Sequence, residues 1–173
     1  LRLMNRGYSL GDYERAVHTA REAIPGLAVT TDVLVGFPGE GEREFEESHR
    51  FCERMSFASM HVFPYSPRRG TAASEMPGQV EERVKKERSQ AMLALARQDA
   101  RSFRHQFLGQ TMEVLWENSA DGTTWSGLTA NYIRVHTRSS ADLSGQLLAA
   151  KLVAEKGHAL LGENLEGGYS RNG

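Results

Sequence analysis

The stretch Thr30-Thr31-Asp32-Val33-Leu34-Val35-Gly36-Phe37-Pro38-Gly39-Glu40 decides the fold of the first part of this 173-residue chain. A short run rich in Val and Thr, residues 27–35, predicts a buried strand, and Gly-Phe-Pro-Gly ends it in a loop. Apolar residues at helical spacing predict helices over residues 10–24 and 42–55, and residues 57–63 form a second strand-like run. Helices and strands that alternate in this way predict a parallel sheet with crossover helices.

The rest of the chain changes character twice. Residues 79–105 contain no Pro or Gly and keep apolar side chains at helical spacing, which predicts one long helix or two in series. Beyond Gly109, short strand-like runs separated by glycine-containing breaks predict a small antiparallel β-barrel. The expected strands are residues 112–116, 124–128, 132–136, 147–154 and 159–165. The polar, Gly-rich residues 166–173 are expected to be disordered.

The composition, with 39% hydrophobic and 25% charged residues, is that of a soluble globular protein. No apolar stretch reaches the ~18–20 residues that span a bilayer, and the first residues lack the layout of a signal peptide. We therefore expect a cytoplasmic protein with no membrane partner. Because the chain starts with Leu rather than Met, we also expect a fragment of a longer protein, of which the sequence does not fix the oligomeric state.

Cysteine and histidine usage limits the metal chemistry of this chain. Cys52 is the single cysteine, which excludes an internal disulfide and any iron–sulfur site built from cysteines of this chain alone. The six histidines are scattered without the spacing of metal ligands, so we expect no metal site.

Charge is unevenly distributed along the chain. Residues 79–105 carry seven basic and four acidic side chains, a net charge of +3, whereas residues 1–78 and 106–165 each carry −2. The predicted helix is therefore the segment that favours a polyanion. A helix of alternating charge is also typical of a solvated face, so both interpretations stay open.

Two unusual loops follow the predicted strands, at residues 36–41 and 64–71. Ligands of open α/β sheets and barrels bind at the carboxyl ends of parallel strands, and glycines let a ligand approach the backbone. The same glycines and prolines are also ordinary turn residues. Asp32, inside an apolar strand, must be paired or lie at the mouth of the strand, either as a structural ion pair or as a ligand contact.

Three blocks together carry a resemblance to a known family. They are Met4-Asn5-Arg6-Gly7-Tyr8-Ser9, the stretch from Thr30 to Glu40, and His61-Val62-Phe63-Pro64-Tyr65-Ser66 followed by Arg68, Gly70-Thr71 and Ala72-Ala73. In order and spacing they resemble the radical-SAM tRNA methylthiotransferases, over residues 1–165.

The resemblance implies a modular enzyme of which this chain is one part. Family members have an N-terminal domain with three cysteines, a partial (β/α) barrel with a C-x-x-x-C-x-x-C motif, and a C-terminal TRAM domain. Each cysteine trio holds a 4Fe–4S cluster. The barrel cluster cleaves S-adenosylmethionine to a 5′-deoxyadenosyl radical, the second cluster serves sulfur delivery, and a second S-adenosylmethionine supplies the methyl group.

By this resemblance, residues 1–78 are the C-terminal half of the barrel, residues 79–105 a connecting basic helix and residues 106–165 a TRAM-like, OB-like barrel. The chain lacks both cysteine trios, so it would bind no cluster and be inactive without the missing N-terminal part, its expected partner besides tRNA. No catalytic residue is assigned.

The resemblance also assigns residues to the sites. The S-adenosylmethionine pocket would be lined by Arg6, Asp32, Gly36, Phe37, Pro38, Gly39 and Glu40. Arg6 could pair with the methionine carboxylate in a fork geometry. The substrate side would be lined by Tyr65, Ser66 and Arg68. One departure from the family pattern is Gly41, where Thr is expected as the helix N-cap.

The C-terminal strands resemble a TRAM domain that holds tRNA. The resemblance lies in Phe107-Leu108-Gly109, Val114-Leu115-Trp116-Glu117 and the stretch from Trp125 to Val135. RNA is gripped by aromatic stacking and by basic groups on phosphates. The expected RNA-binding residues are Arg97, Arg101, Arg104, Trp125, Tyr132 and Arg134. Trp116 is expected in the barrel core, and Trp125 either in the core or stacked on a base.

The predicted function is methylthiolation of tRNA at C2 of N6-threonylcarbamoyladenosine, next to the anticodon. The alternatives are a non-catalytic RNA-binding module and a methylthiotransferase that acts on isopentenyladenosine or on a ribosomal protein. A C-x-x-x-C-x-x-C motif upstream of Leu1 distinguishes the enzyme from the module.

Overall fold

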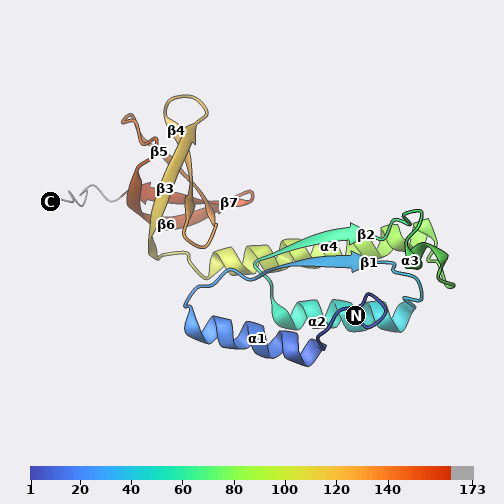
Figure 1. Cartoon of the computed structure of the whole chain (residues 1–173). Helices are drawn as coiled ribbons and strands as arrows, with labels where there is room; N and C mark the ends of the chain where they lie inside the picture. Colours follow the sequence, from blue (N-terminus) through green and yellow to red (C-terminus); the bar gives the residue numbers. More distant parts are fainter. Residues whose placement is uncertain (165–173) are drawn as a thin grey trace. The chain divides into compact units, whose positions relative to one another are not determined.

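The chain divides into two compact units, one of residues 1–100 and one that begins at Arg101 (Figure 1). The computed structural model describes residues 1–164, so the tail expected to be disordered, residues 166–173, lies outside the described part. The long helix α4, Glu82–His105, contributes residues to both units. Among residues 1–164, no helix is long and apolar enough to cross a membrane.

The first unit is built on two parallel strands, β1 (Thr30–Val35) and β2 (Ser59–Pro64), paired in the register Asp32 to His61. Helix α2, Glu42–Met55, is the crossover between them and begins and ends at the predicted residues. Helix α1, Leu10–Ala23, is capped by Ser9: the Ser9 hydroxyl accepts a hydrogen bond from the Asp12 amide, and the Asp12 carboxylate accepts one from the Ser9 amide. The four-residue helix α3, Ala72–Glu75, has no counterpart among the predicted elements.

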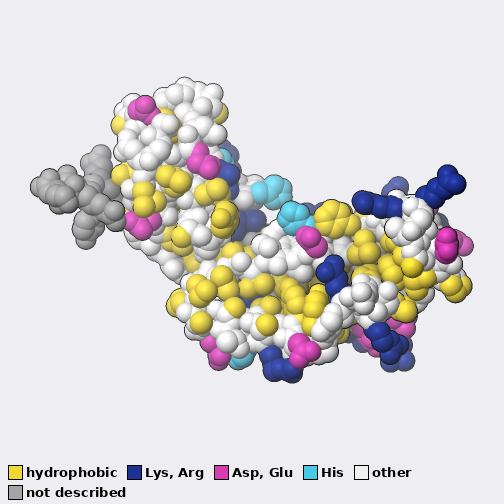
Figure 2. Space-filling model, viewed as in Figure 1, with side chains coloured by type: hydrophobic (Ala, Val, Ile, Leu, Met, Phe, Trp, Pro, Cys, Tyr) yellow, Lys and Arg dark blue, Asp and Glu magenta, His cyan; other side chains and the backbone are white. Residues whose placement is uncertain are grey.

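All three long helices pack on one face of this small sheet. Buried residues of α1, α2 and α4, among them Val17, Phe51 and Met92, form one core with strand residues such as Val35 and Met60. The opposite face of the sheet is open, because residues 30, 32 and 34 of β1 and 61 and 63 of β2 are exposed. Figure 2 shows hydrophobic side chains gathered over the part of this unit that holds β1 and β2.

The second unit is a closed five-stranded barrel with the strand order β3-β4-β5-β7-β6. Its strands are Thr111–Ser119, Thr124–Thr129, Arg134–Arg138, Leu147–Lys156 and Ala159–Asn164. Each predicted strand has a counterpart, but β5 begins at Arg134, two residues later than the predicted strand 132–136. The pairings are antiparallel except for β5 with β7, which is parallel and closes the barrel.

Trp116 fills the centre of the barrel, where its side chain is fully buried, as predicted. Gly127 makes room for it: a Cβ there would lie 2.6 Å from the Leu115 carbonyl oxygen and 2.9 Å from the Trp116 ring. A β-bulge interrupts β3 beside it, because Trp116 pairs with Gly127 while Asn118 pairs with Ser126, which leaves Glu117 as the extra residue.

Candidate functional site

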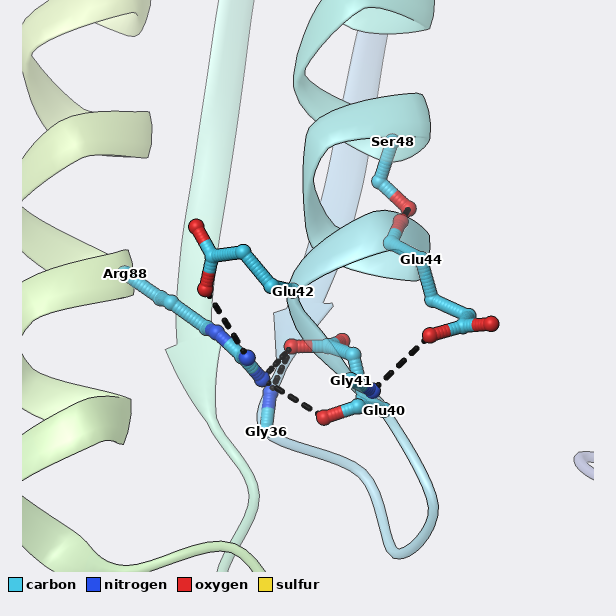
Figure 3. Close-up of polar contacts among 7 residues, drawn as sticks. All are labelled: Gly36, Glu40, Gly41, Glu42, Glu44, Ser48 and Arg88. Atoms are coloured by element: carbon cyan, nitrogen blue, oxygen red, sulfur yellow. Dashed lines mark hydrogen bonds and ion pairs between the residues drawn. The ribbon is translucent and has the colours of Figure 1, made fainter.

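The loop after β1 is closed by its own residues (Figure 3). The Gly36 amide donates a hydrogen bond to Oε1 of Glu40 at 2.8 Å, and the Glu40 amide donates to the Phe37 carbonyl at 2.9 Å. Gly36 has a φ of +74°, and a Cβ there would lie 2.2 Å from Cγ of Lys85. Only glycine fits this position, because both the backbone conformation and the close approach of Lys85 exclude a side chain.

The buried side chain of Arg88, on α4, holds the same loop in place. Its side chain is 7% exposed, and Nη1 donates to the backbone oxygen and to Oε1 of Glu40, each at 2.8 Å. Its guanidinium lies 5.3 Å from the centre of the Phe45 ring, and Nη2 is 3.5 Å from the Glu42 carboxylate. The Glu40 side chain, predicted to line a cofactor pocket, therefore shapes the loop through Arg88 and Gly36.

Lys85, one turn earlier on α4, holds the loop after β2. It is 3% exposed, donates from Nζ to the Tyr65 carbonyl oxygen at 3.1 Å and pairs with the Glu82 carboxylate. Helix α4 therefore fixes both loops at the carboxyl ends of the parallel strands, with one cation for each loop.

Phe37 and Tyr65 bring the two loops into direct contact. Their rings meet edge to face with centroids 5.5 Å apart. Tyr65 is buried, and its hydroxyl has no hydrogen-bond partner among the described residues. Pro38 is fully buried, and the Gly39 amide donates to the Gly78 carbonyl oxygen at 2.8 Å. The structure thus brings Gly36 to Glu40, predicted around the cofactor, together with Tyr65, predicted on the substrate side.

The other predicted pocket residues lie on the surface of the first unit. Arg6, Asp32, Ser66 and Arg68 are exposed, and among residues 1–164 no hydrogen bond or ion pair joins their side chains to the loop. Asp32 lies on the open face of the sheet and forms no ion pair with any described residue, so of the two expected roles the structural ion pair is not observed and the ligand contact stays a prediction.

Lys85 and Arg88 are functional candidates that sequence reasoning missed. From the sequence, the charged residues of this helix predict a solvated face or contacts with phosphates. The sequence contained one indication of their burial: positions 85 and 88 lie at helical spacing from Met92 and Leu95. In the structure positions 85, 88, 92, 95 and 99 are all buried. The two cations thus continue the apolar stripe of α4.

The described residues offer no place for a metal or an iron–sulfur cluster. No group of three or more His, Cys, Asp or Glu side chains that could hold a metal ion occurs among residues 1–164. Burial, and secondarily the charge of Asp99, raises the pKa of the Cys52 thiol to about 11. A thiolate is the ligand form, so this cysteine is poorly suited to bind iron.

The barrel separates the predicted RNA-binding aromatics. Trp125 is 6% exposed and belongs to the core, so its ring is not available to stack on a base. Tyr132 is 80% exposed and has a φ of +63°, a conformation that bulky residues rarely adopt. Its amide donates to the Thr129 carbonyl oxygen at 3.0 Å, and the next amide, of Ile133, donates to the Thr129 hydroxyl at 3.0 Å. This turn holds the Tyr132 ring in solvent.

The predicted basic residues are likewise divided. Arg97 is exposed and forms no ion pair with any described residue. Arg101 and Arg104 instead bind Glu155 of β6 at 2.9 and 2.8 Å, and the Arg104 side chain is only 12% exposed. Hydrogen bonds from Arg104, and then from His105 at 2.8 Å, lower the pKa of Glu155 to about 2. Arg104 is therefore paired with Glu155 within the second unit, and its contact with RNA stays a prediction.

Arg134 lies on the outward side of β5, half-covered by its neighbours. Its Nη1 pairs with the Glu117 carboxylate and lies 3.3 Å from the Ser126 hydroxyl. Tyr132 and Arg134 thus remain the two predicted RNA-binding residues of the barrel that solvent can reach.

Comparison with known proteins finds similarity to curated tRNA methylthiotransferases. No protein-family model matches it. It is 38% identical over 157 residues to the threonylcarbamoyladenosine tRNA methylthiotransferase MtaB of Bacillus subtilis, covering 88% of the chain and 35% of that protein. It is 37% identical over 164 residues to the tRNA-2-methylthio-N(6)-dimethylallyladenosine synthase of Caldicellulosiruptor saccharolyticus, and 37% over 169 residues to that of Moorella thermoacetica.

The two synthase alignments cover 94% and 96% of the chain but 35% and 38% of the relatives. The chain therefore spans about a third of the length of the curated relatives it matches. Within that span the similarity runs through both units, and the chain belongs to the tRNA methylthiotransferase family.

Proposed function

We propose that this chain is the part of a methylthiotransferase that completes the catalytic barrel and binds tRNA, and that the whole protein modifies N6-threonylcarbamoyladenosine. The modification is a methylthio group on C2 of the adenine, next to the anticodon. The observation that carries this proposal is the 38% identity, through both units, to a protein named for that substrate.

The first unit would supply part of an S-adenosylmethionine pocket. Two glycine-containing loops at the carboxyl ends of parallel strands support this, since ligands of such sheets bind there. The buried Tyr65 hydroxyl, which has no partner among the described residues, lies beside Phe37 and fits a ligand with polar groups. Apart from Gly39 itself and its chain neighbours, no described residue comes within 4 Å of a Cβ built at Gly39.

In this proposal Phe37 and Gly39 would pack against the ligand, and Arg6 and Asp32 would approach it once the remaining barrel strands cover the open face. When bound, S-adenosylmethionine supplies a carbon radical and a methyl group. Ser66 and Arg68 would lie toward the tRNA substrate. Lys85 and Arg88 would act as positioning residues that hold the two loops.

The iron–sulfur clusters do not fit the described residues of this chain, since it has one cysteine and that thiol is buried. The clusters of the whole enzyme would therefore rest on cysteines of the missing N-terminal part, and the isolated chain would be inactive. A cytoplasmic location, where tRNA is modified, agrees with this function.

The second unit would bind tRNA through the outward side of β4 and β5. In OB-like barrels the second and third strands form the oligonucleotide-binding face, and β4 and β5 occupy those places. Tyr132 would stack on an unpaired base, and Arg134 would contact a phosphate.

The direct test is activity of the full-length gene product, purified without oxygen, with S-adenosylmethionine, a reductant and tRNA that carries threonylcarbamoyladenosine. Mass spectrometry of digested nucleosides should show the 2-methylthio derivative of that base. A protein that leaves this base unmodified but modifies dimethylallyladenosine would instead support the alternative substrate, for which the 37% identical synthases are named. A protein with bound clusters that modifies neither base would refute the proposal.

A further inference from the structure

An ion pair between Glu117 and Arg134 spans the outward side of the barrel strands proposed to bind tRNA. Strands β4 and β5 alternate buried and partly exposed residues, which places Ser126 and Arg134 on the same outward side. Glu117 of β3 reaches over β4 to Arg134, and the Ser126 hydroxyl lies 3.3 Å from the same Nη1. The carboxylate thus occupies a guanidinium that a phosphate of RNA would otherwise bind.

The position of Glu117 is set by the β-bulge and not by regular pairing. Trp116 and Asn118 pair with consecutive residues of β4, so Glu117 is the extra residue of the bulge. Both Glu117 and Asn118 are exposed, whereas a regular strand would turn one of them inward. Bulges re-aim side chains, and this one places a carboxylate toward a cation two strands away.

The exposed Tyr132 lies two residues before Arg134, in the turn that leads into β5. A base stacked on its ring would bring its phosphates to the Arg134 side chain, and therefore to Glu117. A carboxylate at this point competes for the guanidinium and repels the phosphate.

We propose that Glu117 attenuates tRNA binding by competing with an RNA phosphate for Arg134. The inference rests on the proposed binding of tRNA by the second unit. Both side chains of the pair are 39% exposed, so the pair itself is weak and can open when RNA binds. The pair would lower the affinity of the barrel for tRNA, and it would remove one contact between a basic side chain and an RNA phosphate.

The test is Glu117→Gln in the 173-residue chain, with binding of a fluorescein-labelled tRNA transcript measured by anisotropy over a range of salt concentrations. Glutamine keeps the shape and removes the charge, so affinity should rise about two- to five-fold at low salt. The slope of log affinity against log salt should steepen by about 0.7 to 0.9, as expected for one more phosphate contact.

Glu113→Gln is the matched control. Glu113 is exposed on the same strand and the same side, four residues before Glu117, and forms no ion pair with any described residue. It should raise affinity less than Glu117→Gln and leave the salt slope unchanged. With Arg134→Met already present, Glu117→Gln should gain no more than Glu113→Gln does. Trp116 and Trp125 fluorescence verifies that each variant is folded.

The results distinguish failure of the proposed attenuation by Glu117 from failure of tRNA binding by the second unit. If the wild-type chain binds tRNA but Glu117→Gln and Glu113→Gln raise affinity equally, net charge explains the effect and the attenuator is refuted. Equal gains from Glu117→Gln with and without Arg134 would also refute it. If neither the wild type nor Glu117→Gln binds tRNA at low salt, the proposed RNA role itself fails, and the inference fails with it.

Discussion

Arg88→Met should destabilise the first unit strongly. The substitution keeps the aliphatic part of the side chain against Phe45 and removes the guanidinium. The two hydrogen bonds that Arg88 donates to Glu40 are lost (Figure 3). The Glu40 side chain is 12% exposed, and its Oε1 would then accept a hydrogen bond from the Gly36 amide alone among the described residues.

The expected cost follows from the burial of the pair. Removing one partner of a buried ion pair leaves an uncompensated charge and costs about 3–5 kcal/mol of unfolding free energy. Arg83→Met is the matched control on the same helix, because the Arg83–Glu87 pair has side chains 71% and 58% exposed. An exposed pair of this kind contributes about 0–1 kcal/mol.

Urea unfolding with two probes measures the difference. All of α1 and α2 and most of α4 belong to the first unit, whereas both tryptophans belong to the second. Far-UV circular dichroism should therefore show the Arg88→Met transition at a midpoint lower by roughly 2 M, since urea m-values are about 1–3 kcal/mol/M. Tryptophan fluorescence should change little. Hydrogen exchange of residues 36–44 should rise at the same time. If Arg88→Met and Arg83→Met unfold within about 1 kcal/mol of each other, the buried cation does not hold the loop.

Three further outcomes follow from the described contacts. Hydrogen bonds lower the pKa of Glu155 from 4.5 to about 2, so its contribution to stability is present above pH 4.5 and is lost as the pH falls toward 2. The melting temperature of the second unit, followed by tryptophan fluorescence, should therefore fall more steeply over that range in the wild type than in Glu155→Gln. Trp125→Ala should cost about 3–5 kcal/mol of stability because it truncates a core side chain; a folded variant that loses only RNA affinity would contradict the core assignment. Tyr132→Gly should weaken tRNA binding but keep or raise the melting temperature, since Gly tolerates the positive φ. Cys52, buried with a pKa near 11, should resist a thiol reagent at pH 8 until urea unfolds the chain, and rapid labelling of the native protein would show that the core opens.

The elements that the sequence predicted well are those with a local pattern. Helix α2 has an apolar face and a turn on each side, and the five barrel strands are separated by glycine-containing breaks, so their residues could be placed within a few positions. Helix α3, with four residues, is too short to show any period. The absence of Pro and Gly over residues 79–105 predicted one long helix or two in series, and the structure has one continuous helix, Glu82–His105.

The site was predicted less completely, because burial of charge depends on partners far along the chain. Arg88 is buried by Glu40, 48 residues away, and Lys85 by the Tyr65 carbonyl, 20 residues away. Arg104 likewise meets Glu155 across 51 residues. A helix read alone shows only alternating charges, which are typical of a solvated face.

The two barrel aromatics differ for a related reason. Trp125 shares the inward side of β4 with Gly127 and Thr129, and the strand alternation of buried positions assigns it to the core. Tyr132 was placed in a strand by composition, but it lies in the turn before β5, where alternation no longer applies. The register of pairing decides which ring faces solvent.

The central claim, that this chain is part of an enzyme that methylthiolates threonylcarbamoyladenosine in tRNA, is tested most directly by disrupting the gene and digesting total tRNA to nucleosides. Mass spectrometry should show that 2-methylthio-N6-threonylcarbamoyladenosine disappears, that its unmodified precursor accumulates, and that the full-length gene restores the product. The methylthio derivative of dimethylallyladenosine should be unchanged throughout. If the threonylcarbamoyl product persists at its normal level after disruption, in an organism with no second gene for the same reaction, the account is contradicted.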